Sequence, residues 1–370
     1  MRVLVVNAGS SSLKLRLLDA DDSVLRDLNM PVGESGMDTE KLSACLRRWP
    51  LPDAVGHRIV HGGRQFDGPV PLDATVERAL RDLVALAPLH QPKSLAAYDA
   101  VSALLPEIPA VACFDTAFHA ALPAAAATYA VPREWRERYG VRRYGFHGLS
   151  HRYASRRAAS MLGREPETLR IVTCHLGAGA SLAAVAGGRS VDTTMGFTPL
   201  EGLVMATRSG SVDPGLVLWL QEHECLSARE VAVALERRSG LAALAGTADM
   251  REVERRATAG DEAARLAFDV FIHRLVTGIA AMTAAAGGLD ALVFTGGIGE
   301  HSAGVRRAAC ERLAWLGVAV DMEANASAQG DVDVTGASAA VRTLVIEARE
   351  DIEIARETRG AAVRRPEIQS

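Results

Sequence analysis

The sequence predicts an α/β protein made of two similar halves, and two observations lead to this fold class. Short apolar stretches typical of buried strands alternate along the chain with stretches of helical spacing. The same strand–loop–strand pattern also begins each half, with its small-residue loop at residues 7–12 and again at residues 175–181. A chain of 370 residues is long enough for two domains that each bury a core.

The first half is expected to contain several strands and two helices. Strands are predicted at residues 2–6, 13–18, 54–60 and 110–114, with a further strand and loop within 19–36. Helical spacing of apolar residues occurs at 39–48 and 74–86. Within 13–18, three leucines alternate with Lys14 and Arg16, so one face of this strand is expected to be buried.

The second half repeats the alternation of strands and helices. Strands are predicted at residues 170–175, 182–186, 190–194, 291–295 and 341–346, and a Gly187-Gly188 turn is expected to join the second to the third. Helices are predicted at 152–162, 214–222, 228–237, 261–286 and 351–359.

Composition and charge exclude several classes of protein. The formal net charge is −4, from 41 basic and 45 acidic residues, which gives no electrostatic basis for binding nucleic acid or an anionic membrane. The five cysteines are widely spaced and contain no CxxC pair, so neither a disulfide framework nor a zinc finger is expected. The apolar run at residues 2–6 is too short for the hydrophobic region of a signal peptide. The longest uncharged apolar stretch, at 276–289, is too short to span a membrane. A soluble cytoplasmic protein is expected.

Glycine is the unusual entry in the composition, with 33 residues, and three glycine-containing loops directly follow apolar strands. These loops lie at residues 7–12, 175–181 and 296–300. Backbone N–H groups in such loops bind anions, and glycine lets the backbone approach a phosphate. None of the three has the spacing of a P-loop or of a GxGxxG fingerprint. We therefore expect two phosphate-binding loops, one in each half, facing one another across a cleft.

Seven segments together resemble the acetokinase family, that is, the acetate kinases. They read NAGSSSLK at 7–14, GHRIVHGG at 56–63, FDTAFH at 114–119, RYGFHGLSH at 143–151, CHLGAGASL at 174–182, DTTMGFTPLEGLVMATRSGSVDP at 192–214 and FTGGIGE at 294–300. The resemblance implies a sugar kinase/Hsp70/actin (RNase H-like) fold, with two duplicated domains around a nucleotide cleft. It also implies reversible, Mg²⁺-assisted phosphorylation of acetate by ATP through direct in-line transfer, carried out by a homodimer.

The resemblance further implies a division into domains. Residues 1–148 and a C-terminal helix at about 352–370 would form the domain on the acyl-substrate side. Residues 149–351 would form the nucleotide-binding domain.

Acyl-phosphate synthesis brings two anions together, so it requires cations more than a base. The planar fork of an arginine binds carboxylate or phosphate through two hydrogen bonds. By resemblance, Arg58 binds the acid, Arg208 stabilises the transferring phosphoryl group, His147 donates to its oxygens and Asp115 is the active-site aspartate. A small apolar pocket for the methyl group would be formed by Val60, Leu89, Phe146 and Pro199. His90 would be a further residue of the cleft.

The resemblance also implies nucleotide and metal ligands. The phosphates would lie against Ser12, Lys14, His175, Leu176, Gly177, Ala178 and Gly179. The adenosine of ATP or ADP would lie against Asp249, Met250, Arg251, Gly297, Ile298, Gly299, Glu300 and His301. Mg²⁺ or Mn²⁺ would be held by Asn7 and Glu350.

Three residues depart from the family pattern, and all belong to the nucleotide or metal segments. Ala178 replaces the asparagine of HLGNG, His301 replaces that of GGIGEN, and Arg349 replaces that of TNEE. Our hypothesis is that acid binding is retained while nucleotide affinity or the choice of phosphoryl donor is altered.

The sequence leaves several alternatives open. Propionate or another short-chain acid fits as well as acetate, because one methylene is worth only about 1–3 kcal/mol of discrimination. Pyrophosphate or polyphosphate in place of ATP is a second variant. An actin-like, non-catalytic nucleotide switch is a remote alternative, and a metal-dependent hydrolase built on the i,i+4 pair His147 and His151 is more remote still.

Overall fold

A computed structural model of the chain describes residues 1–9, 12–31, 37–87 and 91–363. The chain divides into two compact units. Unit 1 comprises Met1–Ala120, Gly148–Tyr153 and Arg349–Ser370, and unit 2 comprises Ala121–His147 and Ala154–Ala348. The segment 121–147, which was expected in the first domain, groups with unit 2. Its backbone explains this, because the N–H groups of Tyr144 and Gly145 both donate to the carbonyl of Gly196.

Unit 1 is built on a six-stranded mixed sheet with the order β3-β2-β1-β4-β6-β5. β1 pairs antiparallel with β2 and parallel with β4, and β4 pairs parallel with β6. The strands are β1 (Val3–Ala8), β2 (Ser12–Leu18), β3 (Val24–Pro31), β4 (Ala54–Ile59), β5 (Val70–Pro71) and β6 (Ala110–Phe114). The helices are α1 (Thr39–Leu46), α2 (Ala74–Asp82), α3 (Gln91–Leu104) and α15 (Glu350–Val363).

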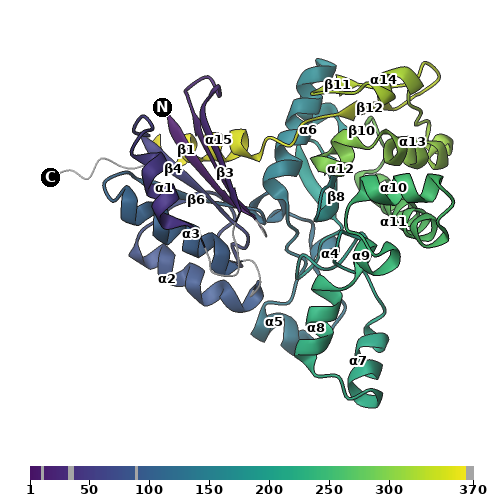
Figure 1. Cartoon of the computed structure of the whole chain (residues 1–370), viewed down its shortest axis with the longest axis horizontal. Coiled ribbons are helices and arrows are strands. Elements are labelled where there is room, and N and C mark those ends of the chain that lie inside the picture. The colour runs from purple at the N-terminus through teal and green to yellow at the C-terminus, as the bar shows by residue number, and fades with distance from the viewer. Residues whose placement is uncertain (10–11, 32–36, 88–90, 364–370) are drawn as a thin grey trace. The chain divides into compact units, whose positions relative to one another are not determined.

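Helices cover both faces of this sheet, because its central strand is apolar on both sides. Leu4 and Val6 of β1 pack with α1 and α3. Val3 and Val5, which point the other way, pack with Ile354 of α15. Figure 1 shows α15, in yellow, lying along the strands of unit 1, although the end of the chain is far from these strands in the sequence.

Unit 2 contains a second six-stranded sheet, whose order is β11-β12-β10-β7-β8-β9. Its strands are β7 (Arg170–Leu176), β8 (Ala180–Ala186), β9 (Arg189–Thr193), β10 (Ala291–Thr295), β11 (Val332–Asp333) and β12 (Arg342–Val345). β7 pairs antiparallel with β8 and parallel with β10, as β1 does with β2 and β4. The order and directions match strand for strand between the units, so the predicted duplication is confirmed.

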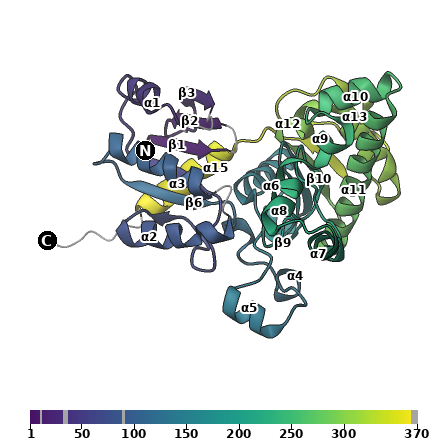
Figure 2. The same cartoon turned by 60° about the horizontal axis from the view of Figure 1, so that its bottom comes forward.

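The remaining helices belong to unit 2, except that α6 (Gly148–Leu162) has its first residues in unit 1. They are α4 (Ala124–Ala127), α5 (Arg133–Tyr139), α7 (Pro214–His223), α8 (Ala228–Arg237), α9 (Gly240–Ala245), α10 (Met250–Thr258), α11 (Glu262–Ala286), α12 (Gly296–His301), α13 (Ala303–Arg312) and α14 (Met322–Ala326). By length and composition α11 is apolar enough to cross a membrane. It packs against β7, β8, α9, α10 and α13, and Figure 2 shows α10 and α13 beside it.

Two glycine-rich segments differ from the sequence-based expectation. Residues 296–300 were expected to form a loop, but α12 begins directly at the end of β10. The carboxylate of Glu300 turns back and accepts the N–H of Gly296 at 2.9 Å, which stabilises this short helix. α6 was expected to begin at residue 152, but it begins at Gly148. A side chain at Gly148 would collide with the carbonyl oxygen of Asp115, which accepts the Gly148 N–H at 2.9 Å.

Candidate active site

Two neighbouring parallel strands of unit 1 bring Arg58 and Asp115 together. Arg58 lies near the carboxyl end of β4, and Asp115 directly follows β6. The Arg58 Nε lies 3.0 and 3.2 Å from the two carboxylate oxygens of Asp115, and its Nη2 lies 2.5 Å from Oδ2. The carboxyl ends of parallel strands are the usual ligand-binding edge of such a sheet. The pair therefore occupies the position expected of a substrate-binding group.

Asn7 and Glu350 extend this contact into a cluster of four residues. The Arg58 Nη1 donates to the Asn7 Oδ1 at 3.1 Å. The Asn7 Nδ2 donates to the Glu350 Oε2 at 2.7 Å. We call Asn7, Arg58, Asp115 and Glu350 the Arg58 cluster. Every member was named as a candidate from the sequence, although Glu350 lies 343 residues from Asn7.

The Arg58 cluster carries two carboxylates against one guanidinium. The Asp115 side chain is 2% exposed and that of Arg58 is 13% exposed. Burial opposes the charge on Arg58, but the carboxylates of Asp115 and Glu350 outweigh it and raise the pKa of Arg58. The net charge of the cluster is thus negative, which favours a bound cation beside it.

The Arg58 cluster fits Mg²⁺ only in part. Mg²⁺ is usually bound by one or two carboxylates, with water and substrate phosphates completing its shell. Asn7 and Glu350 supply one amide oxygen and one carboxylate of the right chemistry. Within the described ranges no group of three or more His, Cys, Asp or Glu residues is arranged to hold a metal. These residues therefore fit an ion whose remaining ligands are phosphate oxygens and water. They do not fit an ion that is coordinated by protein side chains alone.

In unit 2, His147 lies against the hairpin of β7 and β8. Its Nδ1 is 2.9 Å from the Ser181 Oγ, and its ring centroid is 4.4 Å from that of His175. His175 and Ser181 are register partners across the hairpin. His147 has a positive φ of 57°, a conformation that non-glycine residues adopt rarely. We call His147, His175, Ser181 and Arg208 the His147 cluster.

Arg208 reaches the same hairpin from the loop after β9. Its Nη1 donates to the Pro199 carbonyl at 2.6 Å. A β-carbon at Gly179 would lie 2.6 Å from the Arg208 Nη2 and 3.2 Å from the His147 Nε2, so glycine is needed for this approach. In the described part of the chain no carboxylate lies within 4.0 Å of Arg208. Burial lowers the pKa of Arg208, and the more distant charge of Glu236 opposes this.

A pocket of 410 Å³ opens in unit 2 beside the loop that follows β7. It is lined by Gly177, Ala178, Ala248, Asp249, Met250, Arg251, Gly297, Ile298, His301 and Ser302. Asp249 is the N-cap of α10 and accepts the Arg251 N–H at 3.0 Å, and the Arg251 Nη2 lies 2.7 Å from its Oδ2. The size of the pocket is within the range of about 300–1,000 Å³ of small-molecule sites.

Other candidates from the sequence lie outside these groupings. Leu176, Gly299, Val60 and Phe146 are buried, and Lys14 is exposed on β2. The Ser12 carbonyl accepts the N–H of Gly9 at 2.8 Å. The Glu300 carboxylate accepts backbone N–H groups of Gly296 and Ala348, so it holds the backbone. Leu89 and His90 lie outside the described residues.

Three residues of these groupings were not named from the sequence. Ser181 contacts His147, and Ala248 and Ser302 line the pocket. Ser181 belongs to the CHLGAGASL segment, and Ala248 and Ser302 are each adjacent to a named residue, Asp249 and His301. Extending each motif by one residue would have found the last two.

Comparison with known proteins identifies the family. Residues 37–356 match the acetokinase family. This chain belongs to the acetokinase family. The acetate kinase of Deinococcus deserti is 46% identical over 389 aligned residues, which cover 97% of each chain. The acetate kinase of Gloeobacter violaceus is 50% identical over 307 aligned residues, covering 82% of this chain and 76% of the relative.

Solved structures of acetokinase relatives agree with this assignment. The acetate kinase of Porphyromonas gingivalis superposes with a TM-score of 0.88 at 35% identity, covering 98% of this chain and 99% of that one. A propionate kinase from Francisella tularensis gives a TM-score of 0.89 at 35% identity, covering 97% and 99%. The predicted fold class, a duplicated α/β fold of the sugar kinase/Hsp70/actin type, is therefore confirmed.

Proposed function

We propose that this member of the acetokinase family reversibly transfers the terminal phosphoryl group of ATP to acetate, giving ADP and acetyl phosphate. Arg208 carries the proposal. A partly buried guanidinium without a neighbouring carboxylate is costly, and an incoming phosphoryl group supplies the missing negative charge. His147, whose Nε2 approaches the same Gly179 position as the Arg208 Nη2, provides a second group for the phosphoryl oxygens.

The reaction requires alignment and charge neutralisation, and no base. An acetate oxygen attacks the γ-phosphorus, an oxygen–phosphorus bond forms, and the bond to the bridging oxygen breaks with its electron pair leaving on ADP. Acetate is already ionised, so no proton has to be removed. Arg208 and His147 stabilise the charge on the transferring group, and Arg58 binds the acid while Asp115 holds Arg58 in position.

Asn7 and Glu350 are the residues that would hold Mg²⁺, or Mn²⁺ in its place. When bound, the ion neutralises phosphate charge and orients the phosphoryl group for attack. Asn7 also ties Arg58 to Glu350, so the acid-binding and metal-binding candidates belong to one hydrogen-bonded set.

A nucleotide is favoured over pyrophosphate or polyphosphate as donor. The 410 Å³ pocket beside Gly177 and Ala178 is lined by apolar and backbone surface of the kind that holds a nucleoside, which pyrophosphate does not have. For the acid, Val60, Phe146 and Pro199 are the described candidates for a methyl pocket. The Francisella tularensis relative is named a propionate kinase, so propionate remains the second candidate acid.

Trapping of the acyl phosphate with hydroxylamine tests the function. ATP, GTP and pyrophosphate are each combined with acetate, propionate and butyrate in the presence of Mg²⁺. We expect hydroxamate with ATP and acetate, and a lower kcat/KM with propionate. If no donor and acid pair gives hydroxamate, the enzyme proposal fails and a non-catalytic nucleotide switch takes its place. If hydroxamate formed with pyrophosphate but not with ATP or GTP, the choice of a nucleotide as donor would be overturned.

We also propose a cytoplasmic homodimer. α7 supports the dimer, because Leu216, Leu218 and Trp219 on it are exposed and none of its residues is buried. α11 supports a soluble protein, because its buried residues pack against β7, β8 and β9 within unit 2. Light scattering of the native chain and of Trp219→Ser tests the dimer, and a monomeric native chain would contradict it.

A further inference from the structure

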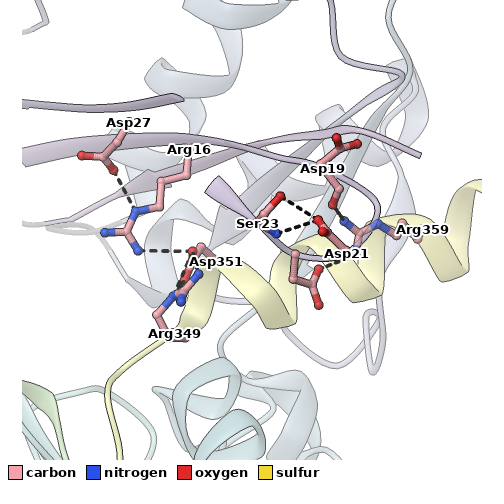
Figure 3. Close-up of polar contacts among 9 residues, drawn as sticks. Arg16, Asp19, Asp21, Ser23, Asp27, Arg349, Asp351 and Arg359 are labelled. Atoms are coloured by element: carbon pink, nitrogen blue, oxygen red, sulfur yellow. Dashed lines mark hydrogen bonds and ion pairs between the residues drawn. The ribbon is translucent and has the colours of Figure 1, made fainter. Parts of the chain in front are cut away.

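An ion-pair network fixes the first turn of α15 to the β2–β3 hairpin of unit 1. The Asp351 carboxylate accepts from the Arg349 Nε at 3.0 and 3.2 Å and from the Arg349 Nη2 at 3.0 Å. The Arg16 Nη1 donates to the same carboxylate at 3.2 Å. The Arg16 Nε in turn donates to Asp27 of β3 at 2.8 Å. Figure 3 shows Asp351 between the two guanidinium groups.

Burial distinguishes this network from an ordinary surface ion pair. The Asp351 side chain is 8% exposed, that of Arg349 is 23% exposed and that of Arg16 is 36% exposed. The hydrogen bonds to Asp351 raise the pKa of Arg349. A carboxylate this deeply buried requires its cations, since an isolated buried charge is strongly unfavourable.

Glu350 lies in the sequence between the two residues of this ion pair. It is the first residue of α15, and the chain enters unit 1 at Arg349, so no earlier turn of helix steadies it. The first turn of α15 also carries the acidic residues Asp351 and Glu353. Arg349 and Arg16 neutralise Asp351 and hold the backbone on both sides of Glu350.

We propose that Arg349, Asp351 and Arg16 are positioning residues that orient the Glu350 carboxylate toward Asn7 for the metal-bound nucleotide. The inference rests on the proposed function, in which Asn7 and Glu350 hold the ion. Residues that orient a metal ligand affect metal affinity although they do not touch the metal. Arg349 also stands where the resemblance to the acetokinase family implies an asparagine.

The test compares two ion pairs on the same helix. Asp351→Asn and Arg349→Gln break the proposed network. Asp22→Asn breaks the pair in which the Arg359 Nη1 donates to the Asp22 Oδ1 at 2.6 Å, further along α15. Asp351→Glu keeps the charge and serves as the conservative variant. The full-length chain is used throughout.

Two properties of each variant are measured, Mn²⁺ binding, which does not require catalysis, and steady-state kinetics. Binding of Mn²⁺ in the presence of ADP is followed by electron paramagnetic resonance, and kcat and KM are measured by hydroxamate formation. For Asp351→Asn and Arg349→Gln we expect Mn²⁺ affinity and kcat to fall about 10- to 100-fold. The acetate KM should change little, because Arg58 is untouched. Asp22→Asn should match the native chain, and Asp351→Glu should lie closer to it than Asp351→Asn.

The outcomes separate this inference from the proposed function. Native-like Mn²⁺ binding and kcat in Asp351→Asn and Arg349→Gln would overturn the positioning role and leave the kinase proposal intact. Equal losses in these variants and in Asp22→Asn would also overturn it, because a general loosening of α15 would explain them. Absence of hydroxamate from the native chain would remove the function, whereas the Mn²⁺ comparison would still report on Glu350.

Discussion

Arg58 holds both carboxylate oxygens of Asp115 and, through its Nη1, the side chain of Asn7. These contacts fix the orientation of the Arg58 guanidinium before any substrate binds. Asp115 is the more deeply buried residue of the Arg58–Asp115 pair. A carboxylic acid that binds to Arg58 meets a cation already constrained by Asp115, which lowers the entropy lost on binding.

Replacement of Arg58 is expected to weaken acid binding and to destabilise the fold. Arg58→Ala removes the guanidinium that is proposed to bind the acid, so the acetate KM should rise strongly. It also leaves Asp115 buried without its cation, which costs about 3–5 kcal/mol of unfolding free energy. Acetate kinetics and urea unfolding check both parts, with Arg58→Lys as the variant that keeps the charge. An unchanged acetate KM would remove Arg58 from the acyl site.

Replacement of Arg208 is expected to separate activity from stability. Arg208→Ala should lower kcat by about 10³–10⁵, because the contact with the phosphoryl group strengthens in the transition state. The melting temperature should stay the same or rise, since no carboxylate partner is lost. Steady-state kinetics and thermal unfolding of the same preparation give the comparison. A change confined to KM would contradict the transition-state role.

Gly179→Ala is the matched steric probe for the Arg208 prediction. It leaves every charge in place but puts a methyl group 2.6 Å from the present position of the Arg208 Nη2, which must then move away. It should reproduce much of the loss in kcat. Native kcat in this variant would mean that the approach of Arg208 to the loop is not used in the reaction.

The sequence predicted the parts of the fold that depend on local pattern. The two strand–loop–strand units, the Gly187-Gly188 turn between β8 and β9, and most strands follow from apolar alternation and turn residues. α12 was not predicted, because glycine favours loops by its own propensity, and the Glu300 carboxylate that caps the helix is held in turn by the distant N–H of Ala348. α3 and α13 were missed because their apolar residues show little helical periodicity, whereas α10 was missed although its apolar and polar faces are well separated.

For the candidate site, local motifs indicated residue types and could not indicate distant neighbours. Arg58 and Asp115 were recognised within short segments, and the parallel pairing of β4 with β6 then accounts for their contact. The contact between Arg16 and Asp351 joins residues 335 positions apart, so no spacing rule reveals it. The same holds for His147 and Ser181, which lie 34 positions apart.

Restoring asparagine at position 178 is expected to strengthen nucleotide binding. Ala178 lines the 410 Å³ pocket, and its carbonyl accepts the Ala206 N–H at 3.2 Å, so the backbone there is held in place. Ala178→Asn adds an amide donor toward the nucleotide, and a hydrogen bond to a charged group is worth about 1.5–3 kcal/mol, or roughly tenfold or more in affinity. The ATP KM should fall accordingly. An unchanged KM and an unchanged nucleotide preference would reject the hypothesis that Ala178 alters donor binding.

His57 makes the stability of the protein sensitive to acid. Its ring is buried beside Tyr98, and within the residues described neither ring nitrogen has a hydrogen-bond partner. Burial lowers the pKa of His57 from 6.5 to about 3. Between these values the unfolded chain binds a proton and the folded chain does not, so stability is lost as pH falls below 6.5.

Other groups titrate in the same range, so the prediction concerns a difference between variants. Burial lowers the pKa of His61 to about 4, which adds to the loss in acid. Burial raises the pKa of Glu357 from 4.5 to about 7, so this carboxyl stabilises the folded state as pH falls through that window and opposes the histidines. These contributions are common to the native chain and to His57→Leu, and they cancel when the two are compared.

The unfolding free energy of native protein and His57→Leu is therefore measured by urea titration from pH 7.5 to pH 5. The native chain should lose about 1.4 kcal/mol more per pH unit than the variant once the pH is well below 6.5. At pH 7.5 the variant should be at least as stable, because two buried nitrogens without partners are replaced by apolar atoms. Parallel pH profiles would mean that the folded chain accommodates the charged form of His57.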